Sequence, residues 1–396
     1  MTSADLDAEL LAIAQAIADP DHPVKRDVAA WAAEDLAQED RIGADWELRF
    51  AADDWKRCAD HGIHGVRVPT ELGGAGADLA TTLLTLEGLG QGCRDNGLAF
   101  AIGSQILSTQ ETIVRFGTSE QQERWIPPLI KGEAYGAFAM TEPDSGSDAY
   151  QVSTRAERRS DGSYVLNGHK AYITIGSRCD MVVVFASTNP DAGRWGLSTF
   201  IVPTDVDGVE RLPNRDKMGM RTTPFGDITL TDAVVPESAL VGREGAGASI
   251  FNSVLEVERS FVFATQVGAV ERQLADAIAY AGEREQGGQP IGHYQAVAHR
   301  LADMKQHHEA ARLFLYRAAI AAVTGTEVAM SAALSKLTAS ETGLAAGLAA
   351  ASVYGAKGYL SEFEVERDVR DAIGGLVYSG TSDIQRNIVA RLLGVG

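Results

Sequence analysis

The sequence has few cysteines, an excess of acidic over basic residues and no long apolar run. Only Cys58, Cys93 and Cys179 are cysteines among 396 residues, and no two of them form a Cys-x-x-Cys pair. Cysteines scattered in this way are typical of reduced structural thiols and not of a disulfide framework. The 35 lysines and arginines stand against 54 aspartates and glutamates, for a formal net charge of −19. Such a field repels nucleic acid, because that binding depends on cations that contact phosphates.

No hydrophobic stretch approaches the roughly 20 residues that a transmembrane helix needs, so no membrane span is predicted. The N-terminal residues 1–5 are acidic and lack the basic-then-apolar order of a signal peptide, which favours a cytoplasmic location. No metal site is predicted, since the histidine pair at 307–308 has no third ligand at metal spacing. The composition, 45% hydrophobic and 22% charged, is that of a folded globular protein.

The pattern along the chain changes twice. Residues 1–134 are mainly helical in pattern, residues 135–241 contain short β-branched runs between turn signals, and residues 242–396 return to long helices. This order predicts an α+β protein (mainly α) with a central β domain, a small barrel or sandwich, and not an alternating parallel sheet. The pattern predicts strands at 163–166, 181–185 and 198–202, and helices at 251–284, 291–324, 327–354 and 381–393.

Two motifs carry chemistry. Residues 137–148 read Ala-Phe-Ala-Met-Thr-Glu-Pro-Asp-Ser-Gly-Ser-Asp, a strand that runs into a polar turn. Residues 378–386, near the C-terminus, read Tyr-Ser-Gly-Thr-Ser-Asp-Ile-Gln-Arg. Together with residues 167–174 and 296–304, these stretches resemble the signatures of the acyl-CoA dehydrogenase family. The resemblance covers almost the whole chain in the same order of helices and strands.

The resemblance implies the acyl-CoA dehydrogenase fold, with an N-terminal helical domain, a central β-barrel-like domain and a C-terminal four-helix bundle. It implies FAD, held between the β domain and the bundle, and a homotetramer or homodimer. The implied reaction is α,β-dehydrogenation of an acyl thioester. An electron-transfer flavoprotein is the implied electron acceptor, with oxygen as the alternative.

The same resemblance assigns residues to the flavin. Thr141 is expected to hydrogen-bond the pyrimidine edge, Tyr172 to lie against the flavin, and Thr174 to reach its reactive nitrogen. Ser147 is expected near the cofactor phosphates or the pyrophosphate-pantetheine part of the substrate. The motifs assign five further positions to the cofactor: Phe138, Met140, Gly355, Thr381 and Asp383.

At the adenosine end, Arg284 matches an arginine that reaches the FAD pyrophosphate of a neighbouring subunit, and Gln295 matches a position near it. Two residues depart from the family pattern there. Gly287 stands where a phenylalanine is usual, and Ser352 where a glutamine is usual. These departures predict weaker contacts with the adenosine end of FAD, or contacts from other groups.

A third departure concerns the catalytic base. Many family members carry a glutamate immediately before Gly-Thr-Ser, and it removes the α-proton of the substrate; here that position is Ser379. A carboxylate shielded from water has a raised pKa and can do this work near neutral pH. Residues 255–264 offer Glu256 and Glu258, which project about 200° apart on a helix and cannot share one face. Of the two, Glu258 shares a face with apolar neighbours.

The resemblance selects the same residue. Isovaleryl-CoA dehydrogenase and its relatives lack the C-terminal glutamate and carry their base in this helix, in a Glu-Arg pair that matches Glu258-Arg259. We therefore predict Glu258 as the base, with Arg259 and Ser147 as substrate-binding residues. The backbone amide beside Gly380 is expected to polarise the thioester carbonyl, a task that does not depend on the side chain, so Ser379 can retain it. The alternative is that Glu258 only pairs with a surface arginine.

Two other functions stay open. The acyl group is carried either by CoA or by the phosphopantetheine of a carrier protein, as in related enzymes of natural-product pathways. A third possibility is a family relative that no longer oxidises and serves as a binding subunit.

Overall fold

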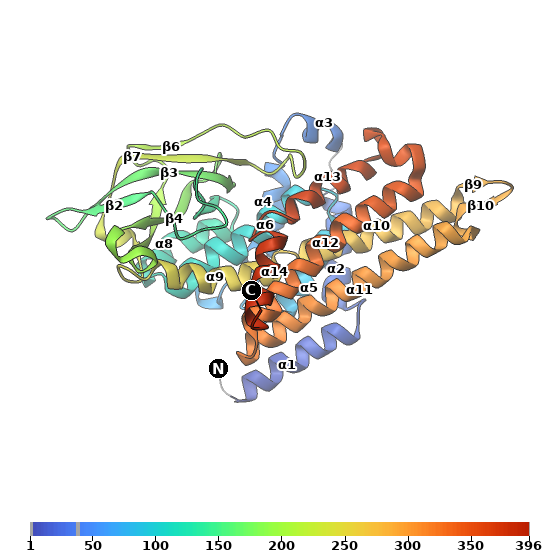
Figure 1. Ribbon diagram of the computed structural model, residues 1–396, viewed down its shortest axis with the longest axis horizontal. Helices are drawn as coiled ribbons and strands as arrows, with labels where there is room; N and C mark the ends of the chain where they lie inside the picture. Colours follow the sequence, from blue (N-terminus) through green and yellow to red (C-terminus); the bar gives the residue numbers. More distant parts are fainter. Residues whose placement is uncertain (1–2, 37–39, 396) are drawn as a thin grey trace.

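A computed structural model describes residues 3–36 and 40–395 of the chain. Helices, then a sheet, then helices follow one another, as Figure 1 shows. The predicted α+β (mainly α) class is confirmed. The N-terminal part consists of α1 (Ser3–Ala18), α2 (Pro23–Asp35), α3 (Arg41–Trp46), α4 (Ala52–Asp60), α5 (Leu79–Gly92), α6 (Asn96–Ser104), α7 (Glu111–Phe116) and α8 (Ser119–Ile130).

Helix α5 is the centre of the helical part. It begins where the side chain of Asp78 accepts a hydrogen bond from the Thr81 amide, an N-cap that satisfies a free donor. Two of its glycines, Gly90 and Gly92, let α10 (Ala264–Glu283) and α2 approach α5 closely. A Cβ at Gly90 would lie 1.8 Å from the carbonyl oxygen of Thr265 on α10, and one at Gly92 would lie 2.1 Å from a carbonyl on α2. Larger residues at these positions would force the helices apart.

The β domain contains an eight-stranded sheet in the described residues, in the order β6-β7-β3-β2-β4-β5-β8, with β1 pairing with β4. Every residue of β4 is buried, which is why this strand is apolar without alternation. The three predicted strands are confirmed. The strands are β1 (Gly136–Ala139), β2 (Arg155–Arg158), β3 (Tyr164–Thr174), β4 (Met181–Ser187), β5 (Leu197–Pro203), β6 (Val209–Arg211), β7 (Phe225–Val235) and β8 (Leu240–Val241).

The C-terminal part is a helical bundle that packs on both α5 and the sheet (Figure 1). A two-stranded hairpin projects from the end of the bundle far from the sheet (Figure 1). No helix in the described part of the chain is long and apolar enough to cross a membrane. The elements are α9 (Gly247–Phe261), α10 (Ala264–Glu283), β9 (Glu285–Gln286), β10 (Gln289–Pro290), α11 (Gln295–Thr324), α12 (Val328–Tyr354), α13 (Val365–Gly375) and α14 (Ser382–Leu392).

The prediction of one helix over 251–284 was wrong. The chain bends at Val262 and Phe263, which separate α9 from α10. Helix α9 packs against the sheet through Phe251, whereas α10 packs closely against α5, so one straight helix cannot serve both surfaces. Both residues at the bend are buried, and Phe263 lies against Tyr378.

Candidate active site

The carboxylate of Glu258, on α9, meets the turn between α13 and α14. Ser379 Oγ donates a hydrogen bond to Glu258 Oε1 at 2.8 Å, although 121 positions separate the two residues in sequence. Glu256 is only two residues away on the same helix, so its side chain projects to the other side. The carboxylate that reaches position 379 is therefore that of Glu258.

The turn that carries Ser379 is held from two sides. Ser379 has φ +54° and Gly380 has φ +85°, both in the left-handed region. The Ser379 carbonyl accepts hydrogen bonds from Arg259 Nε and Gln385 Nε2, each at 3.3 Å, and the Gly380 carbonyl accepts from Gln385 Nε2 at 3.0 Å. These contacts offset the cost of the left-handed serine, which is about 1–2 kcal/mol. Within the described residues, the amides of Ser379 and Gly380 donate to no protein acceptor.

The surroundings of Glu258 favour its protonated form. Burial raises the pKa of Glu258, while the hydrogen bond from Ser379 and the positive charge of Arg259 lower it. Burial also lowers the pKa of Arg259. Burial and then the charge of Glu258 raise the pKa of Tyr378. A carboxyl whose pKa is raised in this way suits general-base catalysis near neutral pH.

Aromatic rings close the space beside the turn. The Tyr378 ring lies 4.4 Å from that of Phe100 on α6 and 5.1 Å from that of Phe263, between centroids. A cavity of about 20 Å³ next to Tyr378 is lined by Phe100 and, from the β domain, by Met220. A cavity of this size holds about one water molecule. The space on this side of Tyr378 therefore suits a small group.

Tyr172 presents its ring outward at the edge of the β domain. It has φ +62°, and its side chain is exposed, with 49% of its surface accessible. Its amide donates to the buried Asp227 Oδ1 at 3.1 Å, and the Arg215 guanidinium carbon lies 5.0 Å from the ring centroid. The pKa of Asp227 is lowered to about 2, and the hydrogen bond from Arg215 is the largest cause. An exposed aromatic ring held in this way fits a planar ligand.

The loop of the first motif lies beside Tyr172. The carbonyl of Thr141 accepts a hydrogen bond from the Ala171 amide at 2.9 Å, so this half-buried threonine adjoins the residue before Tyr172. Buried Glu142 closes the loop because its carboxylate accepts hydrogen bonds from Ser153, Thr154 and Lys170. Ser147 is exposed within this loop.

The other residues assigned to the cofactor have varied surroundings. Met140 has a buried side chain, and Phe138 packs on aromatic residues of β4 and α9. Thr174 is half-buried at the end of β3. Thr381 is the N-cap of α14, where its side chain accepts from the Ile384 amide. Asp383 is exposed in the first turn of that helix.

The adenosine-end residues lie far from Glu258 in one copy of the chain. Arg284 follows the end of α10, Gln295 begins α11 and Gly355 ends α12, and all three are exposed. Because α10 has 20 residues and rises about 1.5 Å per residue, Arg284 lies about 30 Å from the bend beside Tyr378. Figure 1 shows the adjoining β9–β10 hairpin at the end of the bundle away from the sheet.

The structure gives a local reason for one departure from the family pattern. Gly287 has φ +60° in the β9–β10 hairpin, and a Cβ there would lie 2.5 Å from the Tyr294 hydroxyl. That hydroxyl donates to the Gln286 carbonyl at 2.8 Å, so a phenylalanine at position 287 would be strained and would displace the Tyr294 hydroxyl. The second departure, Ser352, bonds within its own helix to the Leu348 carbonyl.

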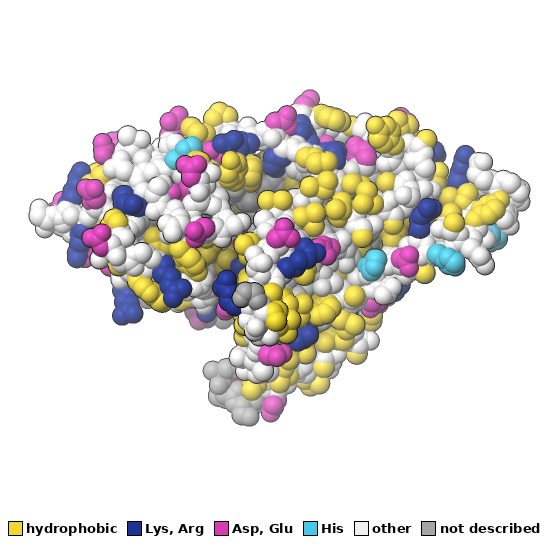
Figure 2. Space-filling model, viewed as in Figure 1, with side chains coloured by type: hydrophobic (Ala, Val, Ile, Leu, Met, Phe, Trp, Pro, Cys, Tyr) yellow, Lys and Arg dark blue, Asp and Glu magenta, His cyan; other side chains and the backbone are white. Residues whose placement is uncertain are grey.

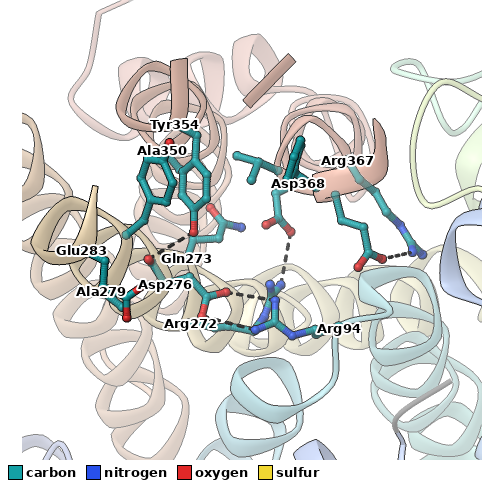
Figure 3. A pocket seen from close by; sticks show the side chains of 14 residues that line it. Arg94, Arg272, Gln273, Asp276, Ala279, Glu283, Ala350, Tyr354, Arg367 and Asp368 are labelled. Atoms are coloured by element: carbon teal, nitrogen blue, oxygen red, sulfur yellow. Dashed lines mark hydrogen bonds and ion pairs between the residues drawn. The ribbon is translucent and has the colours of Figure 1, made fainter. Parts of the chain in front are cut away.

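A cavity of about 320 Å³ lies elsewhere, between α10, α12 and α13 (Figure 3). Arg272 pairs there with Asp368 at 3.2 Å, and Arg94 pairs with Asp276 at 3.0 Å. None of the residues that line this cavity is among the predicted site residues. Arg94 and Arg272 are thus paired with carboxylates in this cavity, and Glu258 does not line it.

Sequence reasoning missed four residues that support the site. Asp227 and Arg215 hold Tyr172, while Gln385 holds the turn at Gly380, and Phe263 packs against Tyr378. No local pattern marks Asp227, Arg215 or Phe263, since each acts across a tertiary contact. Only Gln385 had a signal, because it lies within the C-terminal motif.

Comparison with known proteins identifies the family. Three models match: the acyl-CoA dehydrogenase N-terminal domain at residues 21–133, its middle domain at 137–233 and its C-terminal domain at 245–394. A relative from Pseudomonas fluorescens, L-prolyl peptidyl-carrier-protein dehydrogenase, is 39% identical over 366 residues, which are 92% of this chain and 96% of the relative.

Two solved structures are similar over nearly the whole chain. PigA with FAD and proline has a TM-score of 0.90 at 32% identity, covering 94% of this chain and 97% of that one. Butyryl-CoA dehydrogenase from Megasphaera elsdenii has a TM-score of 0.89 at 32% identity, covering 94% and 98%. The chain therefore belongs to the acyl-CoA dehydrogenase family.

Proposed function

We propose that this chain is an FAD-dependent enzyme that introduces an α,β double bond into an acyl thioester, with Glu258 as the base. The observation that carries the proposal is the 2.8 Å contact between Glu258 Oε1 and Ser379 Oγ. It brings a carboxylate to the position where many family members have their glutamate. The raised pKa of Glu258 supports the same role.

The residues of the β domain fit a flavin. Tyr172 offers an exposed ring, and Asp227 fixes the backbone of this residue. Thr141 and Thr174 offer hydroxyls on the adjoining loop and strand. When bound, FAD supplies the acceptor for the β-hydrogen, which leaves as a hydride. The structure of PigA with FAD supports this cofactor.

The turn at Gly380 provides the second catalytic element. The Ser379 amide, free of protein acceptors within the described chain, suits the thioester carbonyl oxygen, which gains negative charge as the α-proton leaves. Glu258 would take that proton, and the shielded setting keeps its carboxylate from being solvated. One preorganised donor of this kind contributes about 3–4 kcal/mol to the stability of the transition state.

A second copy of the chain would complete the cofactor site. Arg284 lies about 30 Å from the bend beside Tyr378, so we propose that it reaches the FAD of a neighbouring subunit. Figure 2 shows hydrophobic side chains gathered over the bundle. Exposed apolar residues of the C-terminal helices include Leu348 on α12 and Leu392 on α14, and Leu393 directly follows α14. Such a surface fits a dimer or tetramer interface.

Substitution of the base tests the proposal. Glu258→Gln should keep FAD bound but slow flavin bleaching by an acyl thioester about 10²–10⁴-fold under anaerobic conditions, the usual contribution of a general base. Glu256→Gln is the matched control, because it changes the same helix on the other side, and its rate should stay close to wild type. Equal bleaching rates for Glu258→Gln and wild type would refute the assignment. A protein that stays colourless with added FAD would favour a non-oxidising binding subunit.

A carrier-bound thioester is a second candidate substrate. The relative at 39% identity that acts on a prolyl group on a peptidyl carrier protein favours it, whereas butyryl-CoA dehydrogenase favours CoA. The same acyl groups, prolyl and butyryl, should be compared on CoA and on a carrier protein by the bleaching rate. The preferred thioester is the one with the higher second-order rate constant. Re-oxidation by electron-transfer flavoprotein and by oxygen, measured separately, then identifies the electron acceptor.

A further inference from the structure

Ser379 makes a side-chain contact that the family role of this position, a backbone amide, does not require. Its hydroxyl donates to Glu258 Oε1 at 2.8 Å, and its backbone is fixed because Arg259 and Gln385 hold its carbonyl. An ionised carboxylate only accepts hydrogen bonds, so the hydroxyl must be the donor while Glu258 is charged. A short side chain on a fixed turn loses little conformational freedom in making this bond.

We propose that Ser379 is a positioning residue, whose hydroxyl holds Oε1 of Glu258 so that Oε2 is the oxygen that takes the α-proton. The inference rests on the proposed function of Glu258. In the step itself the Cα–H bond of the substrate breaks, its proton forms a bond with Oε2 and its electron pair becomes the Cα=Cβ double bond. The β-hydrogen would leave as a hydride for the acceptor that bound FAD supplies. Ser379 neither gains nor loses a proton.

The charges around Glu258 determine how its pKa changes when the hydrogen bond from Ser379 is lost. Arg259 on the same helix and Ser379 on the turn stabilise the ionised carboxylate, while burial opposes ionisation. Tyr378, on the same turn, is neutral because its own pKa is raised. Removal of the hydroxyl leaves Arg259 as the remaining stabilising group. The pKa of Glu258 should therefore rise further, and the carboxylate should become free to rotate.

Two substitutions separate this role from a purely structural one. Ser379→Ala removes the hydroxyl and keeps the left-handed strain, whereas Ser379→Gly removes the hydroxyl and relieves that strain. If the hydroxyl matters, both variants should behave alike in catalysis although they differ in stability. Ser382→Ala is the matched control, because its buried hydroxyl has no hydrogen-bond partner.

The test measures kcat/KM against pH with the acyl thioester that bleaches the wild-type flavin. A hydrogen bond to a charged group corresponds to about one pKa unit or more, so the acidic limb should move about one unit to higher pH in both Ser379 variants. The rate should also stay about tenfold lower where the base is fully ionised, because the carboxylate is less well oriented. Ser382→Ala should keep the wild-type profile.

A spectroscopic measurement gives a second readout that does not depend on turnover. The infrared band of the protonated Glu258 carboxyl is assigned by its loss in Glu258→Gln. In both Ser379 variants this band should disappear at a higher pH than in the wild-type protein. Wild-type pH profiles in Ser379→Ala and Ser379→Gly would overturn the positioning role. If Glu258→Gln is slow in that case, the base assignment stands and only the role of Ser379 fails. A fast Glu258→Gln enzyme instead refutes the proposed function itself.

Discussion

Replacement of Glu142 by glutamine should destabilise the protein and weaken FAD binding together. The Glu142 carboxylate pairs with Lys170 Nζ at 2.8 Å, and both side chains are almost completely buried. It also accepts hydrogen bonds from the amides of Ser153 at 2.6 Å and Thr154 at 3.0 Å. Glutamine has nearly the same shape but leaves the ammonium of Lys170 buried without a counter-charge. Breaking a buried pair from one side costs about 3–5 kcal/mol.

The pKa of Glu142 gives a second measure of this energy. Burial alone would raise this pKa, but Lys170 and the hydrogen bonds outweigh it and lower the value to about 2. Burial in turn lowers the pKa of Lys170 to about 8. A carboxyl pKa lowered from 4.5 to about 2 corresponds to about 3 kcal/mol, and the lowered pKa of Lys170 offsets about as much, so the energy is seen when one partner alone is removed. This stability is present above pH 4.5, the ordinary value, and should be lost as the pH falls toward 2.

Urea unfolding at pH 7 measures the effect, and FAD titration of the same variants measures its consequence for the loop that carries Thr141. Glu142→Gln combined with Lys170→Met removes both charges and should recover more than half of the lost stability. Glu237→Gln is the control: its ion pair with Arg158 is exposed, so a change below about 1 kcal/mol is expected. A loss below 1 kcal/mol in Glu142→Gln, or a double variant as unstable as the single one, would refute the reasoning.

Two further substitutions test the two sides of the site. Arg215→Met removes the cation above the Tyr172 ring, an interaction of about 0.5–1 kcal/mol, so the Kd for FAD should rise about two- to fivefold, as measured by fluorescence titration. An unchanged Kd would show that the ring needs no support. Phe100→Ala enlarges the small cavity beside Tyr378 and should cost about 3–5 kcal/mol of stability. It should also raise kcat/KM for longer acyl groups relative to butyryl, measured across a chain-length series, and an unchanged ratio would place the acyl group elsewhere.

The order of helices and strands was predictable because hydrophobic periodicity and turn residues are local signals. The runs at 181–185 and 198–202 form the buried strands β4 and β5, and the helix expected at 381–393 is α14. The domain limits at residues 134 and 241 stay predictions. The bend at Val262–Phe263 was not predictable, because it follows from the contacts of α9 and α10 with two different partners.

The site was predictable where a motif or a missing residue pointed to it, and not where a tertiary contact made it. The absence of a carboxylate at position 379 led to Glu258, and the contact between these residues supports that inference. The position of Asp227 under the Tyr172 amide depends on the register of β3 and β7, which contains a shift between Lys170 and Ile173. A bulge of this kind turns a side chain outward but leaves no clear mark in the sequence.

The position of the carboxylate on α9, at Glu258, and the serine at position 379 explain each other. Glu258 Oε1 lies within hydrogen-bond distance of the side chain at position 379. A glutamate at that position would place two carboxylates in one shielded site, where each would raise the pKa of the other. One of them would then stay protonated and could not act as a base. A carboxylate on α9 therefore favours a short neutral residue on the turn, and a serine both leaves the space and donates the hydrogen bond that an ionised neighbour can accept.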